Sequence, residues 1–396
     1  MGIANDMRWS SGASQRVDTR EAVREAVGAL GATHDRAPDL VLAFVSHHHA
    51  SAYDKLSGWV REELGDTIFA GVSSAGVIGA GRELEGREGL SITAAWLPNA
   101  RVRALHVAQL PSDAQALAHS LNLPLSAAPH CLVFPDSATC DTEGLLQALD
   151  AAFPRSAKIG GLVSGGDERP AALLVGDRVH HGGALLCTLE GECELLTLVA
   201  QGCRPVGQQF IVTRSRGNVI QELNAGKPTE VLRKLYDGLD AHDHALFNTS
   251  LFIGVERGSK HGRFEHGDFL IRNVLGIDPE AGAMATDVRL GEYQVVQFHL
   301  RDRDAAAQDL VRHLRAPALA ATASRARGAL LFSCVGRGER LYGVPNHDTD
   351  AFLKRLGPMS VSGMFCNGEI GPVGGKTFVH GHTSVFGVFS EPVPVS

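Results

Sequence analysis

Two charged side chains in the C-terminal part of the sequence stand between glycines, each shortly after an apolar run of strand length. Arg337 lies in segment 332–338 (FSCVGRG), and Glu369 lies in segment 363–371 (GMFCNGEIG). An arginine fork binds a carboxylate through two parallel hydrogen bonds, and a glutamate accepts hydrogen bonds from an ammonium group. A pocket that holds both would suit an amino acid, whereas a direct ion pair between them would lock the two loops together. Both interpretations are open at this point.

Smaller residues beside these charges are candidate ligand contacts. Glycine lets the backbone turn sharply and approach a ligand closely. Gly368 and Gly371 flank Glu369, and we expect both to hold backbone conformations that other residues resist. The complete predicted set is Arg337, Gly338, Asn367, Gly368, Glu369 and Gly371, together with Ser73, Ser74 and Ser164 beside glycines nearer the N-terminus.

Two further motifs are similar to enzyme motifs but depart from them. Segment 371–377 (GPVGGKT) has Ile370 where a phosphate-binding loop requires its first glycine. Segment 71–76 (GVSSAG) places Ser73 after a strand, as in a hydrolase nucleophile turn, but Ala75 replaces the second glycine. We therefore predict no catalytic residue, with a serine hydrolase that uses Ser73 as an alternative.

Histidines suggest a metal at two places. Segment 47–49 is three histidines, and His380 and His382 would share one face of a strand. Neither group has an Asp, a Glu or a further His at a fixed ligand spacing. We predict surface or hydrogen-bonded histidines and no metal site.

The elements that position these residues recur in one order. A strand, a helix and a second strand that runs into a glycine turn follow one another within about thirty residues, the scale of one supersecondary unit. The pattern predicts a partial internal duplication. Alternating stretches between the units indicate antiparallel strands. The expected fold is a mixed α/β (α+β) structure of two lobes, with mixed sheets flanked by helices. The repeated units are strands 40–45 and 67–71 with helix 52–64, strands 131–134 and 158–159 with helix 142–153, and strands 329–333 and 360–365 with helix 348–356.

The glycine motifs, in their order along the chain, resemble those of the FIST family. Segments 334–338 (CVGRG) and 363–371, with the later Thr383, are similar to its C-terminal half, and segments 71–76 and 160–165 (GGLVSG) to its N-terminal half. The resemblance extends from about Pro38 to Phe389. It implies an N-terminal tail and helix at 1–37, a FIST N-terminal-like domain at 38–227 and a FIST C-terminal-like domain at 228–390.

This resemblance implies a non-enzymatic sensory protein that binds a small molecule, and an amino acid would suit the charged pair. The matched region leaves no room for an output module, so we expect a separate signalling protein to read the bound state. No cofactor is expected. The family contains a haem-binding, nitric-oxide-sensing subgroup, which makes haem the alternative.

Composition narrows the remaining classes of function. The 396 residues are 44% hydrophobic and 20% charged, which is typical of a soluble protein of two or three domains. A net charge of −7 argues against a nucleic-acid partner. No apolar run reaches the ~20 residues of a membrane helix, and the first residues lack the pattern of a signal peptide. Seven cysteines without a Cys-x-x-Cys motif disfavour a disulfide framework. We expect a cytoplasmic protein.

Overall fold

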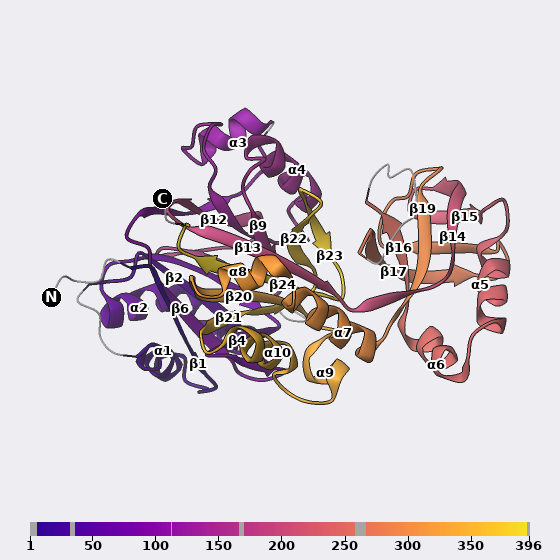
Figure 1. Cartoon of the computed structure of the whole chain (residues 1–396). Helices are drawn as coiled ribbons and strands as arrows, with labels where there is room; N and C mark the ends of the chain where they lie inside the picture. The colour runs from indigo at the N-terminus through magenta and orange to yellow at the C-terminus, as the bar shows by residue number, and fades with distance from the viewer. Residues whose placement is uncertain (1–5, 32–35, 112, 166–169, 258–266, 394–396) are drawn as a thin grey trace. The chain divides into compact units, whose positions relative to one another are not determined.

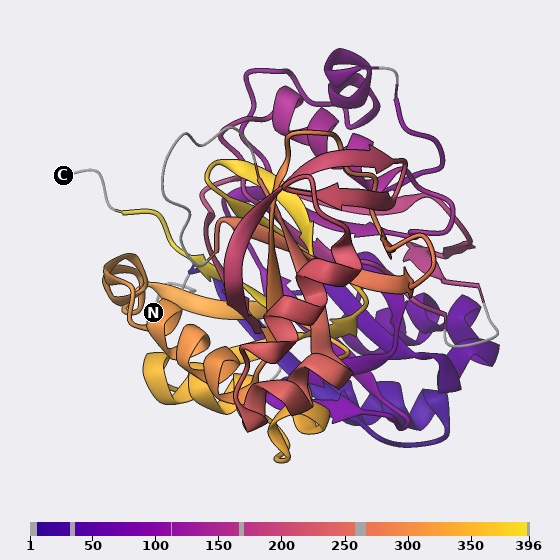
Figure 2. The same cartoon turned by 90° about the vertical axis from the view of Figure 1, so that its right-hand side faces the viewer.

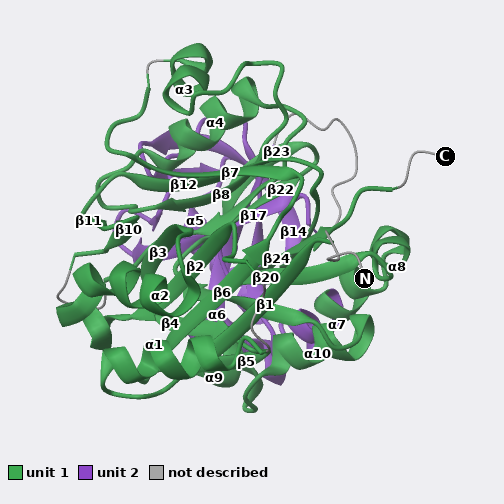
Figure 3. Ribbon diagram, turned by 90° about the vertical axis from the view of Figure 1, so that its left-hand side faces the viewer, with its two compact units in different colours: residues 1–200, 310–379, 383–396 green, residues 201–309, 380–382 purple. Residues whose placement is uncertain are grey.

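The computed structural model describes residues 6–31, 36–111, 113–165, 170–257 and 267–393. The chain divides into two compact units (Figures 1 and 3). Unit 1 takes in residues 1–200, 310–379 and 383–396, and unit 2 takes in residues 201–309 and 380–382. Helices and several mixed sheets are both present, which confirms the predicted fold class. The family boundary expected between residues 227 and 228 lies inside unit 2.

Unit 1 is built from three copies of one chain path, which we call repeats 1, 2 and 3. Each repeat has an edge strand, a helical segment, a strand, a second helical segment, a parallel strand, a β-hairpin and an antiparallel return strand. Repeat 1 comprises β1 (Arg8–Ser14), α1 (Thr19–Gly28), β2 (Leu40–Ser46), the 3-10 helix η1 (His47–Lys55), α2 (Leu56–Leu64), β3 (Ile68–Ser74), β4 (Gly76–Gly79), β5 (Arg82–Glu85) and β6 (Leu90–Trp96). Repeat 2 comprises β7 (Ala100–Val107), α3 (Ala114–Ser120), β8 (His130–Pro135), α4 (Thr142–Ala152), β9 (Lys158–Gly161), β10 (Leu173–Val175), β11 (Arg178–His180) and β12 (Ala184–Gly191). Repeat 3, which unit 2 interrupts in the sequence, comprises β13 (Glu194–Gln201), α7 (Arg303–Leu314), α8 (Pro317–Thr322), β20 (Ala326–Cys334), α9 (Gly338–Tyr342), α10 (His347–Leu356), β21 (Ser360–Cys366), β22 (Glu369–Val373), β23 (Lys376–His380) and β24 (Thr383–Ser390).

The repeats exchange their hairpins. Sheet 1 has the order β1-β6-β2-β3-β10-β11, sheet 2 the order β23-β22-β9-β8-β12-β7, and sheet 3 the order β13-β24-β20-β21-β4-β5. The hairpin β4–β5 of repeat 1 therefore completes the sheet of repeat 3, β10–β11 of repeat 2 completes that of repeat 1, and β22–β23 of repeat 3 completes that of repeat 2. Because each sheet borrows two strands from another repeat, the three repeats form one structural unit.

The predicted strand-helix-strand units are confirmed, and their glycines occupy matching places. β2 runs parallel to β3, β8 to β9 and β20 to β21. In these pairs Gly71 lies opposite Ala43, Gly160 opposite Val133, and Gly363 opposite Leu331.

A side chain does not fit at two of these glycines. A Cβ at Gly160 would lie 1.9 Å from the Val133 carbonyl oxygen, and a Cβ at Gly363 would lie 1.8 Å from that of Leu331. The first strand of the pair thus passes so close that only glycine is accommodated. Gly161, which the sequence suggested as the matching glycine of repeat 2, is one residue further along, where its Cβ would meet the Cys366 sulfur at 2.6 Å.

One aromatic cluster joins the three sheets. Phe44, Phe134 and Phe332 each follow the residue opposite the matching glycine, on β2, β8 and β20. Their ring centroids lie 6.0, 6.2 and 5.6 Å apart, and all three pairs meet edge to face. The three rings belong to one buried cluster that draws on all three sheets.

Separate apolar clusters lie on the outer faces of the sheets, under α1 and α2 for sheet 1, α3 and α4 for sheet 2, and α7, α8 and α10 for sheet 3. Figure 3 shows these helix groups at three corners of unit 1. Unit 1 is therefore a three-sheet core with a helical layer outside each sheet.

Unit 2 is a closed antiparallel barrel with the strand order β14-β15-β18-β17-β16-β19 (Figure 2). Its apolar interior includes Val212, Met284 and Phe298. Among the described residues, no helix is long and apolar enough to cross a membrane. The elements of unit 2 are β14 (Cys203–Arg216), β15 (Val219–Leu223), α5 (Pro228–Asp237), α6 (Ala241–Ser250), β16 (Leu251–Glu256), β17 (Phe269–Asp278), β18 (Ala283–Thr286) and β19 (Val295–Arg301).

Replacing Gly363 by alanine should lower the free energy of unfolding by more than about 1 kcal/mol. The added Cβ would press on the Leu331 carbonyl at a φ of +148°. Gly58 in α2 is the control, because no atom lies within 4 Å of a Cβ there, and alanine should stabilise that helix by up to about 1 kcal/mol. Denaturant titration measures both, and equal effects would contradict the close strand approach.

Candidate functional site

The threefold repetition of unit 1 separates residues that the fold requires from residues that it does not. Glu369 faces Gly161 in the strand register, as Val77 faces Met364 and Leu173 faces Val72. In each pair the second residue directly follows one of the matching glycines. Glu369, Val77 and Leu173 therefore hold the same position, which is apolar in two repeats and carboxylic in the third. The fold itself has no need of a carboxyl group there.

Glu369 is fully buried and points toward the core that the three sheets share. Its Oε2 accepts a hydrogen bond from the backbone N–H of Thr383 at 3.0 Å, and its Oε1 accepts one from the thiol of Cys366 at 3.6 Å. Burial raises the pKa of Glu369 well above its ordinary value and outweighs these hydrogen bonds. Burial therefore favours the protonated form of this carboxyl group.

A second polar substitution in repeat 3 lies on the outer side of sheet 3. Ser333 pairs with Ser384, and their hydroxyl oxygens are 3.2 Å apart. The matching pairs are Val45 with Leu90 in repeat 1 and Pro135 with Ala184 in repeat 2. Repeat 3 thus carries hydroxyl groups where the other two repeats carry apolar groups and a proline.

Arg337 follows β20 and is fully buried, but its partner is Asp348 of α10. Its Nε donates to Asp348 Oδ2 at 2.9 Å, and its Nη2 donates to Asp348 Oδ1 at 3.2 Å and to the Tyr342 hydroxyl at 2.5 Å. Asp348 also accepts from the Ser384 hydroxyl at 2.5 Å and lies 3.0 Å from His347 Nδ1. These five residues form the Arg337 cluster.

The electrostatics of the Arg337 cluster favour a permanent ion pair. Burial alone would raise the pKa of Asp348, but the guanidinium charge of Arg337 holds that pKa far below its usual range. The guanidinium Nη1 is buried and, within the described part of the chain, has no hydrogen-bond partner. Most of the arginine fork is therefore used inside the protein, and one donor is left.

The strand ends that carry Arg337 and Glu369 are neighbours, because β20 and β21 pair in parallel up to Cys334 and Cys366. The two side chains point to different places. Arg337 lies on the helix-covered side of sheet 3. Its cluster partner Ser384 faces that side, because Phe386, two residues further along β24, belongs to the apolar cluster under the helices. Glu369 points toward the central core. The ion pair of Arg337 is with Asp348, a residue that the sequence suggested only as the start of a helix.

The exchanged hairpin of repeat 1 brings two more carboxyl groups to this region. Glu83 accepts a hydrogen bond from the Thr349 N–H at 2.9 Å, and Glu85 accepts one from the Glu339 N–H at 2.9 Å. Burial, and then the negative charge of Asp348, raise the pKa of Glu83 to about 8. No local signal in the sequence connects these residues to Arg337, since they lie more than 250 residues before it.

Gly338 is required by this contact. It has a φ of +61°, and a Cβ would lie 2.2 Å from a carboxylate oxygen of Glu85. Gly368 and Gly371 differ from the expectation, because neither has a positive φ. Space is what limits them: a Cβ at Gly368 would lie 2.6 Å from Leu162 Cδ1, and one at Gly371 would lie 3.0 Å from Val199 Cγ2. The prediction of a special backbone conformation there was wrong.

The remaining predicted contacts lie in different surroundings. Ser73 is buried, and its hydroxyl oxygen accepts the Ala172 N–H at 2.8 Å, which ties it to the chain that enters β10. The hydroxyls of Ser74 and Ser164 are buried and have no hydrogen-bond partner among the described residues. Asn367 is exposed. In the part of the chain that the structure describes, no group of three or more His, Cys, Asp or Glu is placed to hold a metal ion.

Changing Asp348 to Asn should lower the free energy of unfolding by about 3–5 kcal/mol, because the buried Arg337 charge loses its counter-ion. The double variant Arg337→Met, Asp348→Leu removes both charges and should recover at least half of that loss. Denaturant unfolding of the three proteins tests this. If the double variant is as unstable as Asp348→Asn, the unpaired charge of Arg337 is not the cause of the lost stability.

Stability should depend on pH through Glu83 and Glu369. Between the ordinary glutamate pKa and the raised folded-state values, the unfolded chain has lost these protons while the folded protein keeps them. The free energy of unfolding therefore falls as pH rises above the ordinary glutamate pKa, up to about pH 8 for Glu83, and each group contributes at most about 1.4 kcal/mol per pH unit.

Glu83→Gln and Glu369→Gln should each remove their part of this slope, measured by urea unfolding at several pH values. Glu339→Gln, at an exposed carboxyl group, controls for the substitution itself. An unchanged slope in both buried variants would mean that these carboxyls are already ionised in the folded protein.

Comparison with known proteins places this geometry in a family. The FIST N domain matches residues 39–226, and the FIST C domain matches residues 228–372. An uncharacterized protein of Mycobacterium bovis is 32% identical over 389 residues, which are 97% of this chain and 99% of that protein. An uncharacterized protein of Mycobacterium tuberculosis is also 32% identical over 389 residues, 97% of this chain and 100% of that protein. An F-box/LRR-repeat protein of Arabidopsis thaliana is 25% identical over 316 residues, 67% of this chain and 58% of that protein. The two domain matches cover nearly the whole chain, which therefore belongs to the FIST family of sensory, ligand-binding domains.

Proposed function

We propose that this protein is a non-enzymatic cytoplasmic sensor that binds a small amine-bearing molecule, an amino acid in chemical class, beside Glu369. The observation that carries the proposal is the fully buried carboxyl of Glu369 at a position that is Val77 and Leu173 in the other repeats. A buried acid is costly, the other two repeats fold without one at this position, and perturbed carboxyls of this kind gather at functional sites. Membership of a sensory family supports the same conclusion.

The chemistry of Glu369 favours an ammonium group as its partner. A ligand cation would stabilise the ionised carboxylate, so Glu369 would release its proton when the ligand binds. Arg337 offers only Nη1, since its Nε and Nη2 are bonded to Asp348 and Tyr342. This donor lies on the helix-covered side of sheet 3, so Arg337 does not contact a ligand that binds beside Glu369 in the central core. The hydroxyls of Ser74 and Ser164, which are buried and lack a hydrogen-bond partner among the described residues, stay candidate contacts.

Ionisation of Glu369 provides a route from binding to a signal. The carboxyl accepts the N–H of Thr383, the first residue of β24, and the thiol of Cys366, the last residue of β21. A change of charge at Glu369 acts directly on both contacts. A separate signalling protein would read the resulting change in unit 1.

Isothermal titration calorimetry with a panel of amino acids, in two buffers of different ionisation enthalpy, tests the proposal. We expect binding to release about one proton and to tighten as pH rises. Glu369→Gln resembles the neutral acid and should preserve the fold, yet it should abolish the proton release. It should also weaken binding about tenfold or more, the effect of losing a buried charge-assisted hydrogen bond.

Glu83→Gln is the matched control, because it removes another buried carboxyl of unit 1 and should leave the affinity unchanged. Equal affinity and equal proton release in wild type and Glu369→Gln would exclude Glu369 as the contact. A panel without any binding amino acid would exclude the ligand class.

A further inference from the structure

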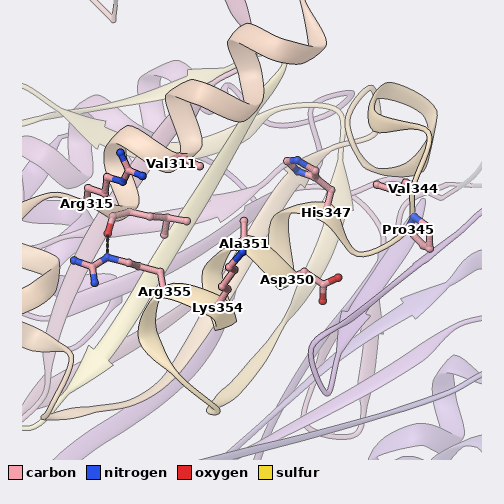
Figure 4. Close-up of a pocket in the computed structure, with 10 residues that line it drawn as sticks. Val311, Arg315, Val344, Pro345, His347, Asp350, Ala351, Lys354 and Arg355 are labelled. Carbon is pink, nitrogen blue, oxygen red and sulfur yellow. Dashed lines mark hydrogen bonds between the residues drawn. The ribbon is translucent and has the colours of Figure 1, made fainter.

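A groove on the outside of unit 1 lies between the end of α7 and α10 (Figure 4). Its volume is about 610 Å³, which is within the range of roughly 300–1,000 Å³ that small-molecule sites occupy. All of its lining residues belong to repeat 3, and none is among the residues proposed above to bind an amino acid. The groove is thus a second candidate site in unit 1.

The lining combines exposed apolar surface with an excess of positive charge. Val344 and Val311 are 50% and 39% exposed and offer apolar surface to a ligand in the groove. Arg315, Lys354 and Arg355 contribute three positive charges against the single carboxylate of Asp350. Figure 4 shows Arg315 and Arg355 at one end of the groove and Val344 and Pro345 at the other.

The cations of the groove are available to a ligand. Among the described residues, no carboxylate forms an ion pair with Arg315, Lys354 or Arg355. Arg355 donates its Nε to the Leu314 carbonyl at 3.0 Å, which fixes the guanidinium at the groove and leaves its two terminal nitrogens. Leu314 and Ala351 add apolar surface to the lining.

We propose that this groove binds an organic anion with an apolar body, its carboxylate, phosphate or sulfonate at Arg315, Lys354 and Arg355 and its apolar part toward Val344 and Pro345. Charge attraction draws the anion to one end, and removal of apolar surface from water stabilises the other. A fully polar anion would leave Val344 exposed, and a neutral apolar molecule would leave the cations without a counter-charge.

His347 connects the groove to the buried Arg337 cluster. It lines the groove, its Nδ1 lies 3.0 Å from Asp348 Oδ1, and its ring stacks on Tyr342 with centroids 3.5 Å apart. A ligand in the groove is therefore one side chain away from the ion pair of Arg337 and Asp348. Binding there would act on the Arg337 cluster without entering the core.

Fluorescence titration of the full chain with 8-anilinonaphthalene-1-sulfonate tests the site, with the uncharged N-phenyl-1-naphthylamine as the matched probe. The double variant Arg315→Gln, Lys354→Gln should weaken sulfonate binding about threefold to tenfold, as expected for exposed charges, and leave the neutral probe unaffected. Arg340→Gln, at an exposed cation of α9 outside the groove, should change neither. Ala351→Trp fills the groove and should abolish binding of both probes.

Wild-type sulfonate affinity in the double variant, or an equal loss in Arg340→Gln, would overturn the proposal. Strong binding of either probe to a folded Ala351→Trp protein would also overturn it, and circular dichroism establishes folding. Glu369→Gln should bind the sulfonate like wild type. Failure of the amino-acid site and failure of the groove are therefore measured separately.

Discussion

No sheet of unit 1 is complete without a hairpin from another repeat, and the rest of the structure depends on this exchange. Each parallel strand pair is extended by two strands that belong to a different repeat, so the backbone groups at that edge are paired only when all three repeats are in place. The edge-to-face contacts of Phe44, Phe134 and Phe332 lie where the three sheets meet. Backbone pairing and apolar burial therefore favour the same threefold arrangement.

A frame that is repeated three times can carry unusual residues in one copy. Two repeats have apolar residues at the positions of Glu369 and Ser384, so the frame is satisfied without polar groups there. Repeat 3 has a carboxyl group and a hydroxyl group at these two positions, and its Arg337 cluster includes Ser384. This difference in chemistry between structurally equivalent positions identifies the functional candidates more sharply than burial alone, since buried polar groups also occur elsewhere in unit 1.

The buried charged groups of repeat 3 are stabilised in two different ways. Asp348 keeps its negative charge because Arg337, Ser384 and His347 surround it. Glu369 bonds the Thr383 N–H and the Cys366 thiol instead, no cation among the described residues forms an ion pair with it, and burial raises its pKa. A permanent ion pair is suited to holding α10 on sheet 3. A neutral buried acid is suited to responding, because a cation brought near it changes its charge. Arg337 and Glu369, which both stand between glycines in the sequence, therefore differ in chemistry: Arg337 belongs to a permanent ion pair, and Glu369 does not.

Local sequence pattern determined much of this protein: the three strand-helix-strand units and the glycine turns that carry Arg337 and Glu369. These features follow from apolar runs, helical spacing and glycine, which act over a few residues. Only the tertiary structure decided that Asp348 is the partner of Arg337, that Glu83 and Glu85 join the same region, and that Gly368 is limited by Leu162 and not by its backbone angles. These contacts depend on hairpin exchange between repeats and on the direction in which each side chain is buried, and local periodicity contains no information about which distant strand completes a sheet.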